Sequence, residues 1–151
     1  MDLGPGLQLR SSLSSNPVGA NHPVILSTLQ AGAVLKIGEN FGMTGGNIIA
    51  GNQITIGDNV AIGGNSLISD TDFHPVNHYE RGLNPQGGQT APVVIEDNVF
   101  IGTNCLILKG VTIGKGSVIG AGSVVTRNIP AGVIAAGNPA KVIKSIHQDE
   151  S

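Results

Sequence analysis

The sequence contains few of the residues on which many protein classes depend. Of its 151 residues one is cysteine and none is tryptophan, and aromatic residues make up only 3%. A single cysteine excludes an intramolecular disulfide and is typical of proteins from a reducing compartment. The formal net charge of −2 gives no electrostatic reason to expect nucleic acid or an anionic membrane surface as a partner.

Long apolar runs are also missing. No stretch approaches the roughly 20 apolar residues that a membrane-spanning helix needs. Residues 1–10 have neither the basic start nor the apolar centre of a secretory signal. We therefore expect a cytoplasmic protein that does not insert into membranes. The length is that of one domain, which we place over residues 1–151.

A six-residue period dominates the second half of the chain. An aliphatic residue returns at every sixth position: Ile95, Ile101, Ile107, Ile113, Ile119 and Val125. A second small or aliphatic residue follows the first five of these by four positions: Val99, Cys105, Val111, Ser117 and Ser123. Because residues two apart on a strand point to the same side, each hexad predicts a short strand with two inward side chains. Glycine and asparagine between the strands predict tight turns.

Such short strands cannot bury a face alone, so they must stack coil on coil, with three hexads to a triangular coil. The same ladder recurs at Ile56, Ile62 and Ile68. A weaker ladder precedes it, with one inserted residue before Ile56 that resets the register: Ile25, Ala31, Ile37, Met43 and Ile49. Unrelated strands of a sandwich or barrel would lack a fixed period. The sequence therefore predicts an all-β solenoid.

Breaks in the period divide the chain into segments. Residues 1–33, rich in Ser, Asn, Gly and Pro, predict a loose N-terminal cap, and residues 34–130 the solenoid itself. Ile95 follows Ile68 by 27 residues instead of six, so a loop over about 69–92 must leave the solenoid, and such insertions often form the binding face. In the C-terminal extension, 131–151, Val142, Ile143 and Ile146 predict one face of a short helix after Pro139.

Four stretches of the chain resemble the hexapeptide-repeat acyltransferases, in particular the branch of galactoside, maltose and capsular-polysaccharide O-acetyltransferases. They are Asp70 to Pro75, Ala91 to Gly102, Val118 to Thr126 and Ala136 to Lys144. The resemblance covers about residues 34–146. It implies a left-handed parallel β-helix, a homotrimer with active sites between neighbouring prisms, acetyl-CoA as the donor and no metal.

Transfer of an acetyl group to a hydroxyl needs a base for the hydroxyl proton and donors for the resulting oxyanion. Histidine is the natural base near neutral pH, and His74 matches the catalytic histidine of the family. In an extended segment Asp70 and Asp72 would project to the same side as His74, so either could accept the second imidazole N–H. A backbone carbonyl does this in some members of the family, and the sequence leaves both options open.

The resemblance also implies the residues that bind the two substrates. Lys141 and Lys144, one helical turn apart, would contact the phosphates of the coenzyme. The full set assigned to the coenzyme is Phe100, Gly102, Gly120, Ala121, Thr126, Arg127, Lys141 and Lys144. Asn47 and His78 are the candidates for the acceptor. Cys105 occupies a small inward position, where burial disfavours a thiolate nucleophile, so we expect direct transfer between the two substrates.

The function predicted from these residues is acetyl-CoA-dependent O-acetylation of a sugar or polysaccharide precursor. N-acetylation of an amino sugar is the alternative within the class. A γ-type zinc carbonic anhydrase shares the fold but needs three histidines, and the loop supplies only His74 and His78. A non-catalytic, ice-binding solenoid would show outward rows of one residue such as threonine, which this sequence lacks.

Overall fold

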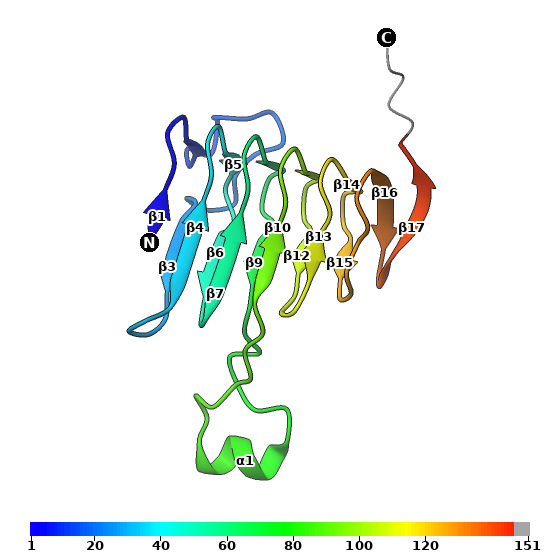
Figure 1. Cartoon of the computed structure of the whole chain (residues 1–151). Coiled ribbons are helices and arrows are strands. Elements are labelled where there is room, and N and C mark those ends of the chain that lie inside the picture. The colour runs from blue at the N-terminus through cyan, green and yellow to red at the C-terminus, as the bar shows by residue number, and fades with distance from the viewer. Residues whose placement is uncertain (147–151) are drawn as a thin grey trace.

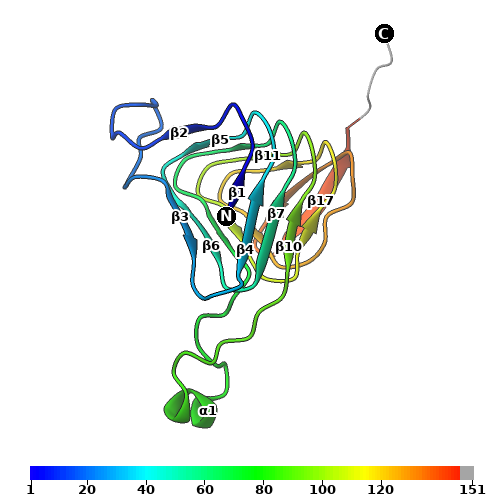
Figure 2. The ribbon, with the colours of Figure 1, turned by 60° about the vertical axis from the view of Figure 1, so that its left-hand side comes forward.

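A computed structural model describes residues 1–146 of the chain. Three sheets, parallel except for the last strand of one, form a triangular prism (Figures 1 and 2). Sheet A contains β1 (Asp2–Leu3), β4 (Val34–Ile37), β7 (Gln53–Ile56), β10 (Val93–Ile95) and β13 (Thr112–Ile113). Sheet B contains β2 (Gln8–Arg10), β5 (Gly42–Thr44), β8 (Ala61–Ile62), β11 (Phe100–Ile101), β14 (Val118–Ile119), β16 (Val133–Gly137) and β17 (Ala140–Ser145). Sheet C contains β3 (Ile25–Thr28), β6 (Asn47–Ala50), β9 (Leu67–Ser69), β12 (Leu106–Ile107) and β15 (Val124–Val125).

Neighbouring strands within sheets A and C differ by three in sequence order, as they do along sheet B from β2 to β14, so each coil contributes one strand to each sheet in turn. The inward residues then stack on their equivalents in the next coil, as Ile56, Ile95 and Ile113 do. All eleven inward positions predicted between Ile95 and Val125 are at most 1% exposed. Ile56, Ile62 and Ile68 are at most 4% exposed, so the predicted solenoid and both of these ladders are confirmed.

The weaker ladder near the N-terminus is wrong in part. Ile25 is 46% exposed, and in β6 the buried side chains are Ile48 and Ala50, whereas Ile49 points outward. The inserted residue therefore lies at the corner between β5 and β6, where Gly45 and Gly46 both have positive φ, instead of after Ile49. Two successive glycines can accommodate an extra residue there without the steric penalty of a Cβ atom.

The N-terminal segment is a coil of the prism and not a loose cap. β1, β2 and β3 pair in parallel with β4, β5 and β6. The connection between β2 and β3 is held by side chains: the Asn21 N–H donates to Asn65 Oδ1 at 2.7 Å, and Asn16 Nδ2 donates to Thr44 Oγ1 at 3.2 Å. Residues 1–33 are poor in apolar side chains because this coil lies at the end of the stack, where another coil covers it on one side only.

The predicted loop leaves the prism after β9 and returns at β10, and we call residues 70–92 the excursion. It stands away from the sheets and carries a short helix, α1 (His78–Leu83) (Figure 1). Asn77 caps the helix by accepting from the N–H groups of Tyr79 and Glu80, and Arg81 Nη1 donates to the Pro75 carbonyl at 2.9 Å. Over residues 1–146, no helix combines the length and apolar character required to cross a membrane.

The predicted C-terminal helix is wrong. Residues 140–145 form β17, which pairs antiparallel with β16 at the edge of sheet B. The exposed edge of β16 offers unpaired N–H and C=O groups, and β-branched residues such as Val142 and Ile143 favour a strand. The residues from His147 onward lie outside the part that the structure describes.

The inward and outward positions of one strand give a matched stability test. Replacing Ile54, which is fully buried, by alanine should lower the free energy of unfolding by about 2–5 kcal/mol through lost burial and a residual cavity. Its neighbour Thr55 points outward from sheet A, and Thr55→Ala should change stability by less than about 1 kcal/mol. Equal losses in urea denaturation would contradict the assigned register.

Candidate functional site

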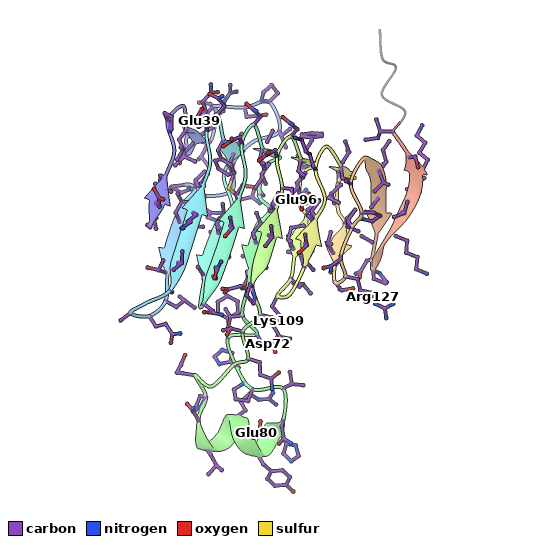
Figure 3. All side chains as sticks on the ribbon, viewed as in Figure 1. Glu39, Asp72, Glu80, Glu96, Lys109 and Arg127 are labelled. Atoms are coloured by element: carbon purple, nitrogen blue, oxygen red, sulfur yellow. The ribbon has the colours of Figure 1, made fainter. Side chains whose placement is uncertain are left out.

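The excursion starts from the corner between sheets C and A, which we call the excursion edge. Two later turns lie at the same corner, residues 108–111 after β12 and residues 126–128 after β15. Asp72, Lys109 and Arg127 accordingly lie along one edge of the prism (Figure 3). Lys109 Nζ is 3.2 Å from Asp72 Oδ2, so an ion pair ties the base of the excursion to the next coil.

His74 lies at the base of the excursion with its side chain exposed. Its Nδ1 is 2.5 Å from the carbonyl oxygen of Pro85, on the returning arm of the excursion. Because a carbonyl oxygen can only accept, Nδ1 must carry the proton, and in the neutral ring Nε2 then keeps its lone pair. The contact thus fixes the tautomer that a general base requires, with Nε2 free to meet a substrate.

The backbone before His74 is tightly constrained. The His74 N–H donates to the Asp72 carbonyl at 2.7 Å across a three-residue turn, and Phe73 at its centre has φ of 61°. A bulky residue in this conformation is strained by about 1–3 kcal/mol, so the surroundings must hold it there. Gly88 packs against this turn, and a Cβ atom at Gly88 would lie 2.7 Å from the His74 nitrogen. A side chain at position 88 would therefore displace His74.

Neither aspartate contacts the imidazole of His74. Asp70 is fully buried and accepts three backbone N–H groups of the preceding coil, from Gly51 at 2.6 Å, Asn52 at 2.8 Å and Gln53 at 2.6 Å. Asp72 forms the ion pair with Lys109. Of the two orienting groups that the sequence left open, the backbone carbonyl is the one that contacts His74, and the assignment of Asp70 or Asp72 to this role is wrong. Asp70 instead fixes the corner from which the excursion departs.

Three of the residues assigned to the coenzyme meet at one pocket. Thr126, Arg127 and Lys141 line a cavity of about 310 Å³ together with Pro139 and Ala140, between the last turn of the excursion edge and the β16–β17 hairpin. The pocket presents a guanidinium and an ammonium group, which is the charge that phosphates require.

Lys144 lies on the same face of β17 as Lys141, although no helix joins them. Lys144 pairs with Ile134 and Lys141 with Ala136, and these partners point to the same side of β16. The three-residue spacing fits because the register shifts at Ile134/Ala135, which leaves Ile143 as the extra residue of a bulge.

The remaining predicted residues lie elsewhere on the prism. Phe100 points outward from sheet B and is 49% exposed. Gly102, Gly120 and Ala121 occupy the corner between sheets B and C, where the close stacking of coils leaves no room for a Cβ atom at Gly102. One chain therefore does not bring these residues to His74.

The two acceptor candidates are also apart from each other. Asn47 lies in sheet C, and its Oδ1 is 2.9 Å from His22 Nε2. His78 is the first residue of α1, and its ring lies 4.0 Å from that of Tyr79. The structure thus places only His78 in the excursion that carries His74.

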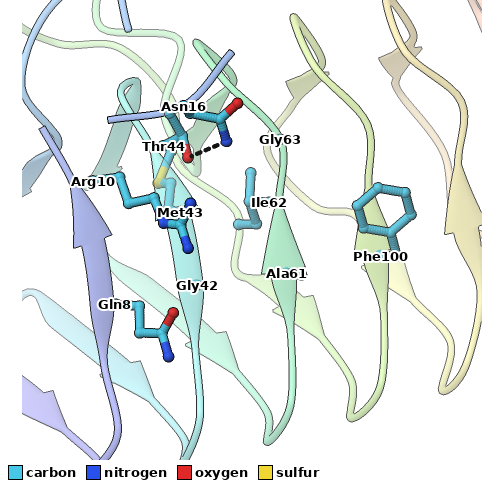
Figure 4. A pocket seen from close by; sticks show the side chains of 10 residues that line it. All are labelled: Gln8, Arg10, Asn16, Gly42, Met43, Thr44, Ala61, Ile62, Gly63 and Phe100. Carbon is cyan, nitrogen blue, oxygen red and sulfur yellow. Dashed lines mark hydrogen bonds between the residues drawn. The ribbon is translucent and has the colours of Figure 1, made fainter. Parts of the chain in front are cut away.

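A second pocket was not predicted from the sequence. It lies on the outer face of sheet B, has a volume of about 240 Å³, and includes Gln8, Arg10, Thr44 and Phe100 (Figure 4). We call it the sheet B pocket. No sequence pattern indicates this pocket, because residues 8–16 have no hexad repeat and their place beside β5 depends on the stacking of the first coil.

Cys105 is fully buried, and its Sγ lies 3.2 Å from the Gly120 carbonyl oxygen. Burial raises the pKa of the Cys105 thiol, which favours the neutral form and disfavours a nucleophilic thiolate. Within residues 1–146, no three His, Cys, Asp or Glu side chains are grouped so that they could hold a metal ion.

Comparisons with known proteins agree on one family of sequences. A sequence model described as the hexapeptide repeat of succinyl-transferase matches residues 53–69 and 92–127. A curated 2,3,4,5-tetrahydropyridine-2,6-dicarboxylate N-acetyltransferase from Clostridium perfringens is 47% identical over 57 residues, which is 38% of this chain. The match spans about a quarter of that relative's length, 24%.

Two solved structures cover most of the chain. A maltose O-acetyltransferase from Clostridium difficile is 37% identical with a TM-score of 0.66, over 82% of this chain and 67% of that one. A galactoside acetyltransferase in complex with coenzyme A is 34% identical with a TM-score of 0.77, over 97% of this chain and 65% of that one. The similarity therefore includes the whole prism.

The structural role of Asp70 can be separated from that of Asp72 by the same substitution at both. Asp70→Asn replaces one carboxylate oxygen by an NH₂ group, which cannot accept the backbone N–H bonds that this oxygen receives. The substitution should lower the free energy of unfolding by about 3 kcal/mol. Asp72→Asn breaks only a partly exposed ion pair and should lower it by at most about 1 kcal/mol. Thermal and urea unfolding would measure both, and equal stability of the two variants would contradict the role of Asp70.

Proposed function

This chain belongs to the family of hexapeptide-repeat acyltransferases, and we propose that it transfers an acetyl group from acetyl-CoA to a hydroxyl of a sugar or polysaccharide precursor. The resemblance inferred from the sequence motifs and the left-handed parallel β-helix that it implied are confirmed. Similarity to galactoside and maltose acetyltransferases supports a sugar hydroxyl as the acceptor. The three relatives described above are acetyltransferases, which favours acyl transfer over a zinc hydratase or a non-catalytic solenoid.

The observation that carries the proposal is the contact of His74 Nδ1 with the Pro85 carbonyl. In the proposed reaction Nε2 takes the proton of the acceptor hydroxyl while the oxygen forms a bond to the thioester carbonyl carbon. The carbon–sulfur bond then breaks, and the proton held on Nε2 passes to the departing thiolate of coenzyme A. No acyl-enzyme is needed, which fits the buried, neutral Cys105.

The pocket beside the β16–β17 hairpin is the proposed site for the nucleotide end of the coenzyme. Arg127 and Lys141 line it, and Lys144 lies on the same face of β17. Cationic side chains that bind the end of a long substrate far from the reacting atoms contribute binding energy without taking part in the chemistry. Because acetyl-CoA is a cytoplasmic metabolite, we place the protein in the cytoplasm.

A homotrimer with sites between neighbouring prisms is part of the proposal. His74 stands at the excursion edge, whereas Phe100 and the sheet B pocket lie on another face of the same prism. The excursion also presents three apolar side chains to solvent, with Val76 81%, Tyr79 74% and Leu83 88% exposed. Apolar groups exposed to this extent favour contact with a neighbouring chain, and that contact would bring the His74 of one copy toward sheet B of the next.

N-acetylation of an amino sugar is the second candidate. The curated relative that is 47% identical over 57 residues is an N-acetyltransferase, and the same base could take a proton from the ammonium group before attack, or from the amine nitrogen as it attacks the thioester. Parallel assays with a hexose and the matching 2-amino hexose would separate the two activities.

Replacement of His74 tests the proposed base. His74→Ala should lower kcat by roughly 10²-fold to 10⁴-fold with little change in the KM for acetyl-CoA. Gly88→Ala should lower kcat in the same direction, because the added methyl group displaces the His74 backbone. Thr55→Ala, on the outer face of sheet A and away from the excursion, is the control. If the rate of acetyl transfer by His74→Ala stays within a few-fold of the wild-type rate, His74 is not the general base.

The coenzyme site is tested with two donors. The double variant Arg127→Ala, Lys141→Ala should bind acetyl-CoA roughly tenfold or more weakly, because two charge-assisted contacts to phosphates are lost. The KM for S-acetylpantetheine, which lacks the nucleotide, should remain unchanged. Lys36→Ala on sheet A is the matched control. Calorimetry with unchanged acetyl-CoA affinity in the double variant would remove this pocket from the donor site.

A further inference from the structure

One row of outward-pointing residues forms the floor and walls of the sheet B pocket. Across neighbouring strands of the sheet, Gln8 pairs with Gly42, Gly42 with Ala61, and Ala61 with Phe100. Strands lie about 4.8 Å apart, so Gln8 and Phe100 are separated by about 14 Å, with only a hydrogen and a methyl group between them. The result is a shallow depression, wide enough for one sugar ring, between an amide and a half-exposed aromatic ring (Figure 4).

Arg10 supplies the charge at this depression. It is the last residue of β2, its backbone pairs with Thr44, and its carbonyl accepts the Gly45 N–H at 2.9 Å. The side chain thus starts from a fixed strand and extends over the pocket (Figure 4). Among residues 1–146 the one ion pair is that of Lys109 with Asp72, so Arg10 has no carboxylate partner there. No acidic side chain lines the pocket either.

The side of the pocket next to Arg10 is rigid. Thr44 is only 5% exposed, and its Oγ1 accepts from Asn16 Nδ2 at 3.2 Å, while Asn16 Oδ1 accepts the Val18 N–H at 3.0 Å. These bonds tie the N-terminal segment to sheet B. The backbone from which the Arg10 side chain extends is therefore fixed relative to the pocket, and this favours a specific ligand over diffuse attraction.

We infer that the sheet B pocket binds an acceptor sugar that carries a negative charge, a carboxylate or a phosphate, which Arg10 pairs with directly. The planar guanidinium matches either anion with two parallel N–H bonds. Phe100, which the family resemblance assigned to the coenzyme, is assigned here to the acceptor and covers the apolar face of the ring. Gln8 contacts the hydroxyls of the ring, in the usual division between apolar walls and a few orienting polar groups. The inference rests on the proposed function, because it names the class of acceptor for that reaction.

Equilibrium binding tests the inference without requiring turnover. The wild type, Arg10→Gln, Arg10→Lys and the control Lys36→Gln are titrated by NMR with D-glucose, D-glucuronate and D-glucose 6-phosphate at fixed ionic strength. The wild type should bind at least one acidic sugar about tenfold more tightly than glucose. Arg10→Gln should remove this difference and leave glucose affinity unchanged, Arg10→Lys should keep part of it, and Lys36→Gln should match the wild type. The tighter of the two acidic sugars identifies the anion.

Equal affinity for all three sugars would overturn the inference, and so would the absence of binding at tens of millimolar. Two further results would also contradict it: a preference for acidic sugars that persists in Arg10→Gln, or one that falls equally in Lys36→Gln. Either result would show that the preference arises from the overall charge of the protein and not from Arg10. Acetyl-CoA titrated into the same samples separates the two proposals. Failure to bind acetyl-CoA would contradict the proposed function, whereas normal acetyl-CoA binding with charge-independent sugar binding would contradict this inference alone.

Discussion

The parallel stacking of inward aliphatic side chains is the constraint on which the rest of the structure depends. Because Ile56, Ile95 and Ile113 must remain in register, every corner of one coil lies over the same corner of the next. Residues far apart in sequence therefore line up along an edge, and Asp72, Lys109 and Arg127 share the excursion edge for this reason. The packing of the core thus determines the positions of the functional side chains on the prism, although no core residue is itself one of them.

The excursion departs from this regularity, and its anchoring explains how an exposed histidine can keep a defined geometry. Asp70 uses both carboxylate oxygens to fix the preceding coil, and Gly88 closes against the strained turn at Phe73. The stability of the prism thus supports a locally unfavourable backbone beside His74, as is common at functional sites. The carbonyl of Pro85 then sets the tautomer of the ring.

The six-residue period alone predicted the solenoid, the position of the excursion and the burial of Cys105, because each depends on a local repeat. It did not predict the partner of His74, since Pro85 is brought close only by the return of the excursion. It placed the extra residue after Ile49 instead of at Gly45 and Gly46, because an aliphatic triplet in β6 fits either register. β17 was missed because its conformation depends on the open edge of β16, and the sheet B pocket because it needs the stacked first coil.

His74 lies at the excursion edge, whereas Phe100 lies at the sheet B pocket on another face of the same prism, so the proposed active site requires two chains. Coexpression of His74→Ala with Phe100→Asp, followed by purification of the mixed oligomer, tests this most directly. Each variant alone should be inactive. In the proposed trimer, when both variants are present, one of the three interfaces joins an intact His74 to an intact Phe100, so the purified mixed oligomer should regain about a third of wild-type acetyl transfer. A mixed oligomer as inactive as its parents would show that both groups must lie on the same chain, and would contradict the account.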